Sequence, residues 1–262
     1  MNFRPFEMIA EKSANDALIL TDQKNWICEY AGLNPPKAAL FSSDMAGMDG
    51  AKYQSSKLNT RNVVLTFTLL RDIPDSRLKL YEFFRTGQYV KLVYAGTRNV
   101  WIDGYVETIS ADQFKNTRHK EVVQVSILCY DPLLKSTEDV EIVPDSASTT
   151  FNYGGDVVSG LDIDIEFSGS VTDVILTDGS GNTMTVKGSF VADDKLHICT
   201  VRGKKAVEKD VEGTITNMIG SVQFGSSWLQ LHSGENTISY SATSGDEYMS
   251  LVYTFTPKYE AV

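Results

Sequence analysis

Apolar and polar residues alternate along most of this chain with the period of two that is typical of β-strands. In the segment NVVLTFTLL, apolar residues occupy every second position from Val63 to Leu69. The segments EVVQVSILC at 121–129 and LDIDIEF at 161–167 repeat the pattern. Such alternation places one face of a sheet against a core and the other face in water. The pattern predicts a mainly β protein.

One segment, DIPDSRLKLYEFFRTGQ at 72–88, departs from this alternation. Its apolar residues recur at the spacing of a helix face instead. We expect one short helix over about 75–86, capped at its start by Asp75 or Ser76. Gly87 suits the end of such a helix, because glycine adopts the left-handed conformation that often follows one.

A change in composition near residues 131–157 predicts a domain boundary. The stretch DPLLKSTEDVEIVPDSASTTFNYGGDV contains two prolines, a cluster of Ser and Thr, and a Gly-Gly pair. We expect an N-terminal β domain over 1–133, a linker over 134–154, and an all-β sandwich over 155–262. Evenly spaced short strands with turn signals between them favour a sandwich for the last part.

A long polar stretch, MAGMDGAKYQSSKLNTR at 45–61, precedes the strand that begins near Val63. It contains Gly47 and Gly50, and it ends on Arg61. From the residues alone, this stretch is expected to be a loop. It is either a catalytic loop or a loop that contacts a neighbouring copy of the same protein.

Composition narrows the classes of function. The chain has 262 residues, 42% of them hydrophobic, and a net charge of −10. That length allows two domains with real cores. The negative charge argues against wrapping around nucleic acid, because phosphate contacts need basic patches. No stretch approaches the length of a membrane helix, so no membrane insertion is expected.

The residue types that carry chemistry do not form a recognisable motif. An odd number of cysteines and scattered histidines give no metal-ligand spacing; these residues are Cys28, Cys129, Cys199, His119, His197 and His232. Asp162, Asp164 and Glu166 follow one another at the spacing of a solvent-facing strand, which needs no catalytic role. We therefore expect no enzyme, with no catalytic residue, no cofactor and no metal.

Several segments, taken in order, resemble a known family. They are AGLNPPKAALFSSDMAGMDGAKYQSSKLNTRNVVLTF, LYEFFRTGQYVKLVY, IDGYVETISADQF and VSILCYDPLL, followed by GDVVSGLDIDIEFSG and SSWLQLHSGENTISYSA. This order is similar to the distal tail protein of long-tailed bacteriophages, a baseplate hub component, or to its equivalent in phage-derived tail particles. The resemblance covers almost the whole chain and rests on the ordered set, since no single motif in it is specific.

The resemblance implies a fold and an assembly. The N-terminal domain would be a split β-barrel with a helix and an extended hairpin, and the C-terminal domain a galectin-like β-sandwich. Six copies would form a ring between the tail tube protein and the tail-tip hub protein, with the C-terminal domains outward, near receptor-binding proteins. DNA would only pass through the channel of this ring. Such a protein belongs to the virion tail tip and is assembled in the cytoplasm of the bacterial host.

Within this resemblance, the polar stretch is expected to reach the neighbouring copy. Gly47 and Gly50 allow backbone conformations that other residues resist, and Arg61 can pair with a carboxylate across the interface. The alternative is that Arg61 pairs within its own domain.

A carbohydrate-binding module for host recognition is the second function that the sequence leaves open. Sugar sites often use aromatic platforms, and Trp228 and Tyr240 are the candidates for such a contact. Trp228 lies in an apolar run, SSWLQL, which favours a place in the core or in an interface.

Overall fold

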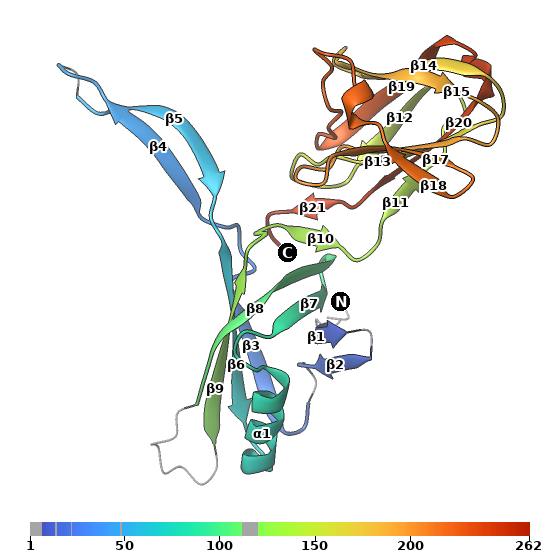
Figure 1. The fold of residues 1–262 in the computed structure, drawn as a ribbon. Helices are drawn as coiled ribbons and strands as arrows, with labels where there is room; N and C mark the ends of the chain where they lie inside the picture. Colours follow the sequence, from blue (N-terminus) through green and yellow to red (C-terminus); the bar gives the residue numbers. More distant parts are fainter. Residues whose placement is uncertain (1–6, 14, 22, 48, 112–119) are drawn as a thin grey trace. The chain divides into compact units, whose positions relative to one another are not determined.

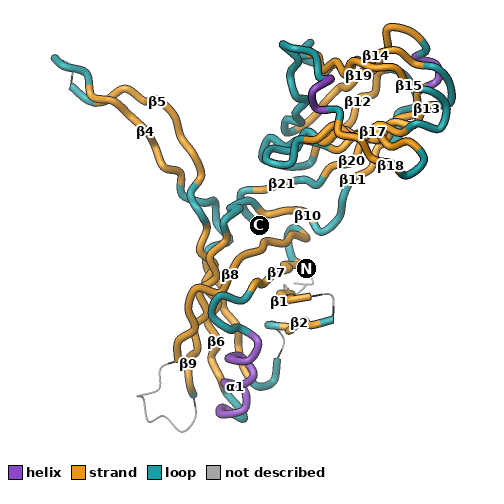
Figure 2. The backbone as a smooth tube through the Cα atoms, viewed as in Figure 1, coloured by secondary structure: helices purple, strands orange, loops and turns teal. Residues whose placement is uncertain are grey.

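The computed structural model describes residues 7–13, 15–21, 23–47, 49–111 and 120–262. The chain folds as two compact units (Figure 1). Unit 1 comprises residues 1–137 together with 259–262, and unit 2 comprises residues 138–258. Strands dominate both units (Figure 2), which confirms the expected mainly β fold class.

The described part of unit 1 is built on one large antiparallel sheet. Its strands follow the order β2-β1-β7-β8-β9-β6-β3, and β10 adds to the edge of β8 and pairs with β21. Their bounds are β1 (Glu7–Ser13), β2 (Asp16–Ile19), β3 (Trp26–Ala31), β6 (Arg61–Leu69), β7 (Tyr89–Ala95), β8 (Asn99–Ala111), β9 (Glu121–Cys129), β10 (Leu134–Ser136) and β21 (Lys258–Tyr259).

The alternation read from the sequence accounts for the core of unit 1. Val63, Leu65, Phe67 and Leu69 all lie on the inner face of β6 and are fully buried. They pack with inward residues of the neighbouring strands and with Phe84, which follows the helix. Burial of each large apolar side chain contributes about 1.5–3 kcal/mol.

The helix α1 begins earlier than the sequence predicts. It spans Ile73–Phe83, and its N-cap is Asp72 rather than Asp75 or Ser76. Asp72 has a left-handed backbone and makes no capping hydrogen bond through its side chain. Proline at the second helical position favours this start, since its fixed φ suits a first turn and its missing N–H is not needed there.

The polar stretch is a hairpin rather than a loop. β4 (Ala38–Asp44) pairs antiparallel with β5 (Ala51–Leu58) from Ala38↔Leu58 to Asp44↔Ala51. The loop expected over 45–61 is therefore confined to 45–50 and 59–60, whereas 51–58 is a strand of the kind of hairpin that the family resemblance implied. Polar serine, lysine and glutamine obscured the strand, because a two-stranded ribbon with both faces in water needs no apolar alternation.

The described residues of unit 2 form two antiparallel sheets around one core. The larger sheet has the order β11-β20-β13-β16-β17-β18, and the smaller has the order β12-β19-β14-β15. Their bounds are β11 (Val140–Ile142), β12 (Ser148–Tyr153), β13 (Asp162–Phe167), β14 (Val171–Asp178), β15 (Thr183–Phe190), β16 (Lys195–Cys199), β17 (Ala206–Val211), β18 (Thr214–Asn217), β19 (Gly234–Ser244) and β20 (Met249–Phe255), with short 3₁₀ turns η1 (Ile219–Ser221) and η2 (Asp246–Tyr248).

The stretch 134–154, expected as a linker, is largely strand. β10 belongs to the sheet of unit 1, while β11 and β12 each extend a sheet of unit 2. The chain crosses from one unit to the other between Thr137 and Glu138, and it returns to unit 1 for its last four residues. Prolines and serines at the edges of sheets read as linker signals in a sequence, because edge strands tolerate residues that central strands do not.

Candidate functional sites

Two glycines, Gly47 and Gly50, form the turn at the tip of the β4–β5 hairpin. Gly47 and Gly50 have φ angles of 80° and 88°, in the left-handed region. A Cβ added to either would meet nothing within 4 Å, so the backbone conformation and not close packing requires glycine here. Both glycines are exposed, and they reverse the chain between the two strands.

The sides of this hairpin carry apolar side chains into solvent. Leu40 is 71% exposed, Tyr53 60% and Phe41 44%. Within the described residues the hairpin is a separate two-stranded sheet. An isolated two-stranded hairpin is marginally stable in water, and exposed apolar residues gathered on one element mark interaction surfaces. These side chains are therefore exposed on an element that pairs with no other strand among the described residues.

Arg61 lies at the start of β6 with only 3% of its surface exposed. Its Nη1 donates a hydrogen bond to the Gly32 carbonyl at 3.1 Å, and its Nη2 donates to the Glu260 carbonyl at 2.7 Å. Burial lowers the pKa of the guanidinium, and the neighbouring Cys129 and Glu260 oppose this shift. Both hydrogen-bond partners belong to unit 1.

This geometry fits the alternative in which Arg61 pairs within its own domain. The sequence contained the signal, because Arg61 falls two residues before Val63 on the inward-facing side of the same strand. An arginine at the inward end of an alternating strand must find buried acceptors, which here are backbone carbonyls. A contact between Arg61 and a neighbouring copy stays a prediction.

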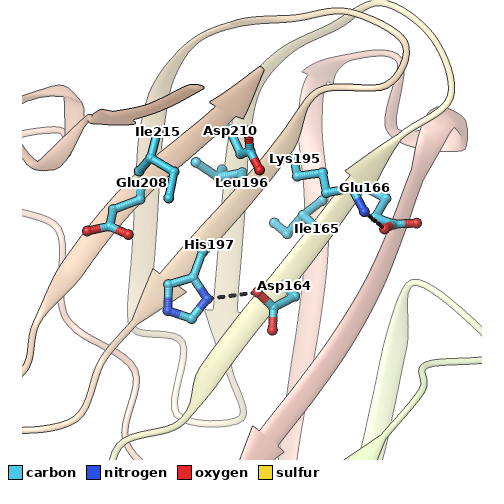
Figure 3. Close-up of a pocket in the computed structure, with 9 residues that line it drawn as sticks. All are labelled: Asp164, Ile165, Glu166, Lys195, Leu196, His197, Glu208, Asp210 and Ile215. Carbon is cyan, nitrogen blue, oxygen red and sulfur yellow. Dashed lines mark hydrogen bonds and ion pairs between the residues drawn. The ribbon is translucent and has the colours of Figure 1, made fainter. Parts of the chain in front are cut away.

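A groove of about 450 Å³ crosses the outer face of the larger sheet in unit 2 (Figure 3). Its polar lining comes from β13, β16 and β17, and Ile215 of β18 forms its apolar rim. The charged lining residues are Asp164, Glu166, Lys195, His197, Glu208 and Asp210. As the strand spacing predicts, Asp164 and Glu166 are exposed.

His197 is the basic centre of this groove. Its Nδ1 lies 2.7 Å from a carboxylate oxygen of Asp164, and its Nε2 lies 3.9 Å from one of Asp162 (Figure 3 shows the first contact). The hydrogen bond to Asp164 raises the pKa of His197; burial opposes the rise, while Asp162 and Glu208 add to it. Lys195 forms an ion pair with Glu166 at 2.5 Å in the same groove.

No hydroxyl or thiol side chain lines the described groove. Nearby Cys199 is buried, and its burial raises the pKa of the thiol to about 11, with a further contribution from Asp162. A thiol with a raised pKa holds its proton and is a poor nucleophile. The histidine and the carboxylates form a charged feature on the surface of this sheet.

One carboxylate in a turn of unit 2 is buried. Asp194 follows Asp193 in a turn, yet it is only 2% exposed. Its carboxylate accepts a hydrogen bond from the Val191 N–H at 2.9 Å and pairs with Lys209 at 2.6 Å. Burial alone would raise the pKa of Asp194, but these two partners lower it overall. This pairing joins two segments that are apart in sequence, so no local pattern indicates it.

Trp228 and Tyr240, the candidates for a sugar contact, are only partly exposed. Both are half-buried and pack against the core of unit 2, and Lys205 lies over the Trp228 ring at 4.8 Å from its centroid. Neither residue lines either of the two cavities described here.

A second cavity, of about 420 Å³, lies beside β12, the β14–β15 turn and the start of β19. Its side chains are mainly polar, from Thr150, Asp178, Ser180, Gln230, His232, Glu235, Asn236 and Thr237, above an apolar floor of Leu229, Leu231 and Ile238. The Asn236 amide bonds the backbone of His232 and Gly234, which fixes the loop.

Cys28 and Cys129 are buried free thiols, and burial raises the pKa of each to about 12. Within the described ranges, no group of three His, Cys, Asp or Glu side chains is placed to hold a metal ion. Of the expected histidines, His119 lies outside the described residues. No described helix has the length and apolar character needed to cross a membrane.

Comparison with family models identifies the C-terminal part of the chain. Residues 154–259 match the model described as the siphovirus-type tail component, C-terminal domain. This match covers most of unit 2. No curated protein sequence matches the chain.

One solved structure extends the likeness to the whole chain. The SPP1 Dit protein, described as a paradigm of the hub adsorption apparatus in phages that infect Gram-positive bacteria, matches with a TM-score of 0.75 and 17% identity. The match covers 97% of this chain and 99% of that protein. A chain of the phage P2 baseplate in its activated conformation with calcium aligns over 99% of this chain and 100% of that one, at 10% identity and a TM-score of 0.49.

The whole-chain likeness shows that both units have the fold of Dit. Together with the domain match, it supports the expected Dit-like distal tail protein. The matched family is a structural tail component, which argues against an enzyme.

Proposed function

We propose that this protein is a hub component of a phage tail, in which six copies form a ring that joins the tail tube to the tail tip. The observation that carries the proposal is the match of the whole fold to the SPP1 Dit hub protein, over 97% of the chain. The tail-component domain at 154–259 supports it independently. The protein belongs, on this proposal, to the virion tail, where its partners are the tail tube protein, a tail-tip hub protein and receptor-binding proteins.

The exposed hairpin supports assembly from identical copies. A closed ring needs a heterologous interface, in which one surface of each copy meets a different surface of the next. The β4–β5 hairpin offers apolar side chains that its own chain leaves exposed, with Gly47 and Gly50 shaping its tip. We propose that the hairpin, rather than the side chain of Arg61, is the main element of this interface.

The acidic composition suits a channel that DNA traverses. A net charge of −10 on each copy repels the phosphate backbone within a Debye length of about 8 to 10 Å. DNA would therefore pass through the ring without binding to it.

The experiment that tests this proposal is a mass measurement of the purified protein and of the assembled tail tip. Native mass spectrometry and negative-stain imaging should give a particle six times the 29.0 kDa mass of one chain, with six-fold symmetry. A monomer within assembled tails, or a ring of another order, would refute it.

The second cavity favours one alternative, a carbohydrate-binding module in unit 2. Gln230, His232 and Glu235 are exposed around an apolar floor, and polar groups of mixed donor and acceptor character suit a hydroxyl-rich ligand. Titration of the protein with host cell-wall polysaccharide, compared with a Gln230→Ala and Glu235→Ala double variant, would test this alternative. Equal binding of the polysaccharide by both proteins would exclude the cavity as its binding site.

A further inference from the structure

Three tyrosines form a continuous exposed row on the outer face of the unit 1 sheet. Tyr89 of β7 pairs in register with Tyr105 of β8, and their ring centroids lie 5.8 Å apart. Tyr130, which follows β9, lies 6.2 Å from the Tyr105 ring. Both contacts are edge-to-face. The three side chains are 36%, 46% and 66% exposed.

The fold of unit 1 does not require these aromatic side chains. Val90, Gly104 and Val106, which are their neighbours along the strands, face the core and are buried. The row points the other way, where sheets usually carry polar residues. The Tyr89 hydroxyl donates a hydrogen bond of 3.4 Å to Asp103, whereas Tyr105 and Tyr130 leave much of their surface exposed to solvent.

The surroundings of the tyrosine row have the composition of a protein interface. Interfaces combine an aromatic centre, in which tyrosine is enriched, with a polar rim. Asp103, Glu107 and Asp131 lie beside the row in sequence, and Glu107 and Asp131 are exposed. Lys135 balances part of this charge, since it pairs with both Asp103 and Asp131. The rim remains acidic after this pairing.

The chain itself contains a segment that complements this surface. The hairpin carries Leu40, Phe41 and Tyr53 in solvent. Although the whole chain has a net charge of −10, the segment 37–58 contains three lysines and two aspartates, so it is slightly basic. Apolar side chains flanked by lysines match an aromatic row with an acidic rim.

We propose that the tyrosine row receives the hairpin of a neighbouring copy. The inference rests on the proposed ring and adds the surface on which the hairpin docks. Each copy then offers one hairpin and one row, so every contact is of the same heterologous kind and the ring closes without leaving either surface exposed. Tyr105 is the central contact, because it touches both other tyrosines.

Substitution in the row tests the proposal. The double variant Tyr105→Ser and Tyr130→Ser should weaken ring formation at least tenfold, as expected for loss of central interface tyrosines. Its melting temperature should stay close to that of the unmodified chain, because neither side chain is in the core. Phe224→Ser is the matched control, since Phe224 is a fully exposed aromatic residue of unit 2. This control should leave the ring intact.

Disulfide trapping between copies gives the decisive measurement. One preparation carries Leu40→Cys or Tyr53→Cys in the hairpin, and the other carries Tyr105→Cys. After mixing and mild oxidation, the proposal expects a crosslinked dimer from these pairs and none when Phe224→Cys replaces Tyr105→Cys. The native cysteines are buried and do not compete.

The outcomes separate this inference from the proposed function. A six-fold ring that forms normally in the double tyrosine variant and gives no hairpin-to-row crosslink would overturn the docking surface and leave the hub function standing. Failure of the unmodified protein to form a ring, both alone and in tails, would overturn the hub function and the docking surface with it.

Discussion

The Nη2 atom of Arg61 donates a 2.7 Å hydrogen bond to the carbonyl oxygen of Glu260, a residue 199 positions further along the chain. This contact fastens the returning C-terminal segment to the start of β6. Arg98 holds the same segment through the Ala261 carbonyl at 3.1 Å and through the ring of Tyr259. The two arginines thus fix the place where the chain comes back to unit 1.

Arg61→Ala should destabilise unit 1 by about 1–3 kcal/mol, because it removes a buried side chain together with its hydrogen bonds to the partly buried carbonyls of Gly32 and Glu260. Thermal and urea unfolding of the full chain measure the loss. Arg85→Ala, at an exposed arginine, should change little. Weaker ring assembly with an unchanged melting temperature would instead support a direct contact of Arg61 with a neighbouring copy.

Gly32→Ala should be among the most damaging single substitutions in unit 1. Gly32 has a φ of 97°, and an added Cβ would lie 2.1 Å from the backbone oxygen of Asn62. Strain and steric overlap together should cost more than about 2 kcal/mol. Gly47→Ala has a similar φ but open space around it, so it should cost no more than about 1 kcal/mol. Equal losses in urea unfolding would contradict this account.

Tyr253→Phe should stabilise unit 2 or leave it unchanged. The Tyr253 side chain is fully buried, and its hydroxyl has no hydrogen-bond partner among the described residues. An unsatisfied buried hydroxyl destabilises a fold by about 1–3 kcal/mol, and its removal relieves this penalty. The small void that remains offsets part of the gain. A clear loss of stability in calorimetry would indicate that a bound water satisfies the hydroxyl.

The pairing of His197 with Asp164 should make the stability of unit 2 depend on pH. The pKa of His197 is raised above 6.5 in the folded state, so its protonated form stabilises the fold. This contribution is fully present below pH 6.5, and it is lost as pH rises through the raised pKa. His197→Gln should remove this pH dependence. The part of the free energy of unfolding that is lost should be about 0.2–1 kcal/mol, because the pair is exposed. Urea unfolding of both proteins at several pH values would measure the difference, and parallel curves would contradict it.

The boundaries of unit 2 predict which fragment folds. A fragment of residues 138–258 keeps β11 and β12, whereas 155–262 lacks both strands. The shorter fragment loses the buried rings of Phe151 and Tyr153, which contact Phe255 at 5.5 and 5.6 Å between centroids. Losing either ring from a core costs about 3–5 kcal/mol. Circular dichroism should show a cooperative transition for 138–258 and a weaker or absent one for 155–262.

The class of fold and most of the core follow from the pattern of apolar residues along the chain. Strict alternation from Val63 to Leu69 and from Leu161 to Phe167 fixes which side chains are buried, because a strand has only two faces. The order of segments along the chain also indicated the family resemblance. The same alternation places Arg61 on the inward face of the strand. It does not indicate which carbonyl groups accept the hydrogen bonds of Arg61.

Only the tertiary structure decided the contacts that join distant segments. Arg61 meets Glu260, Asp194 meets Lys209, and the three tyrosines meet across β7, β8 and the end of β9. No local pattern encodes these pairs, because they depend on strand order and register. The family resemblance implied an extended hairpin, but the residues themselves did not indicate where its strands lie. A ribbon with water on both faces needs backbone pairing and no apolar period, so the pairing of β4 with β5 is visible only in the structure.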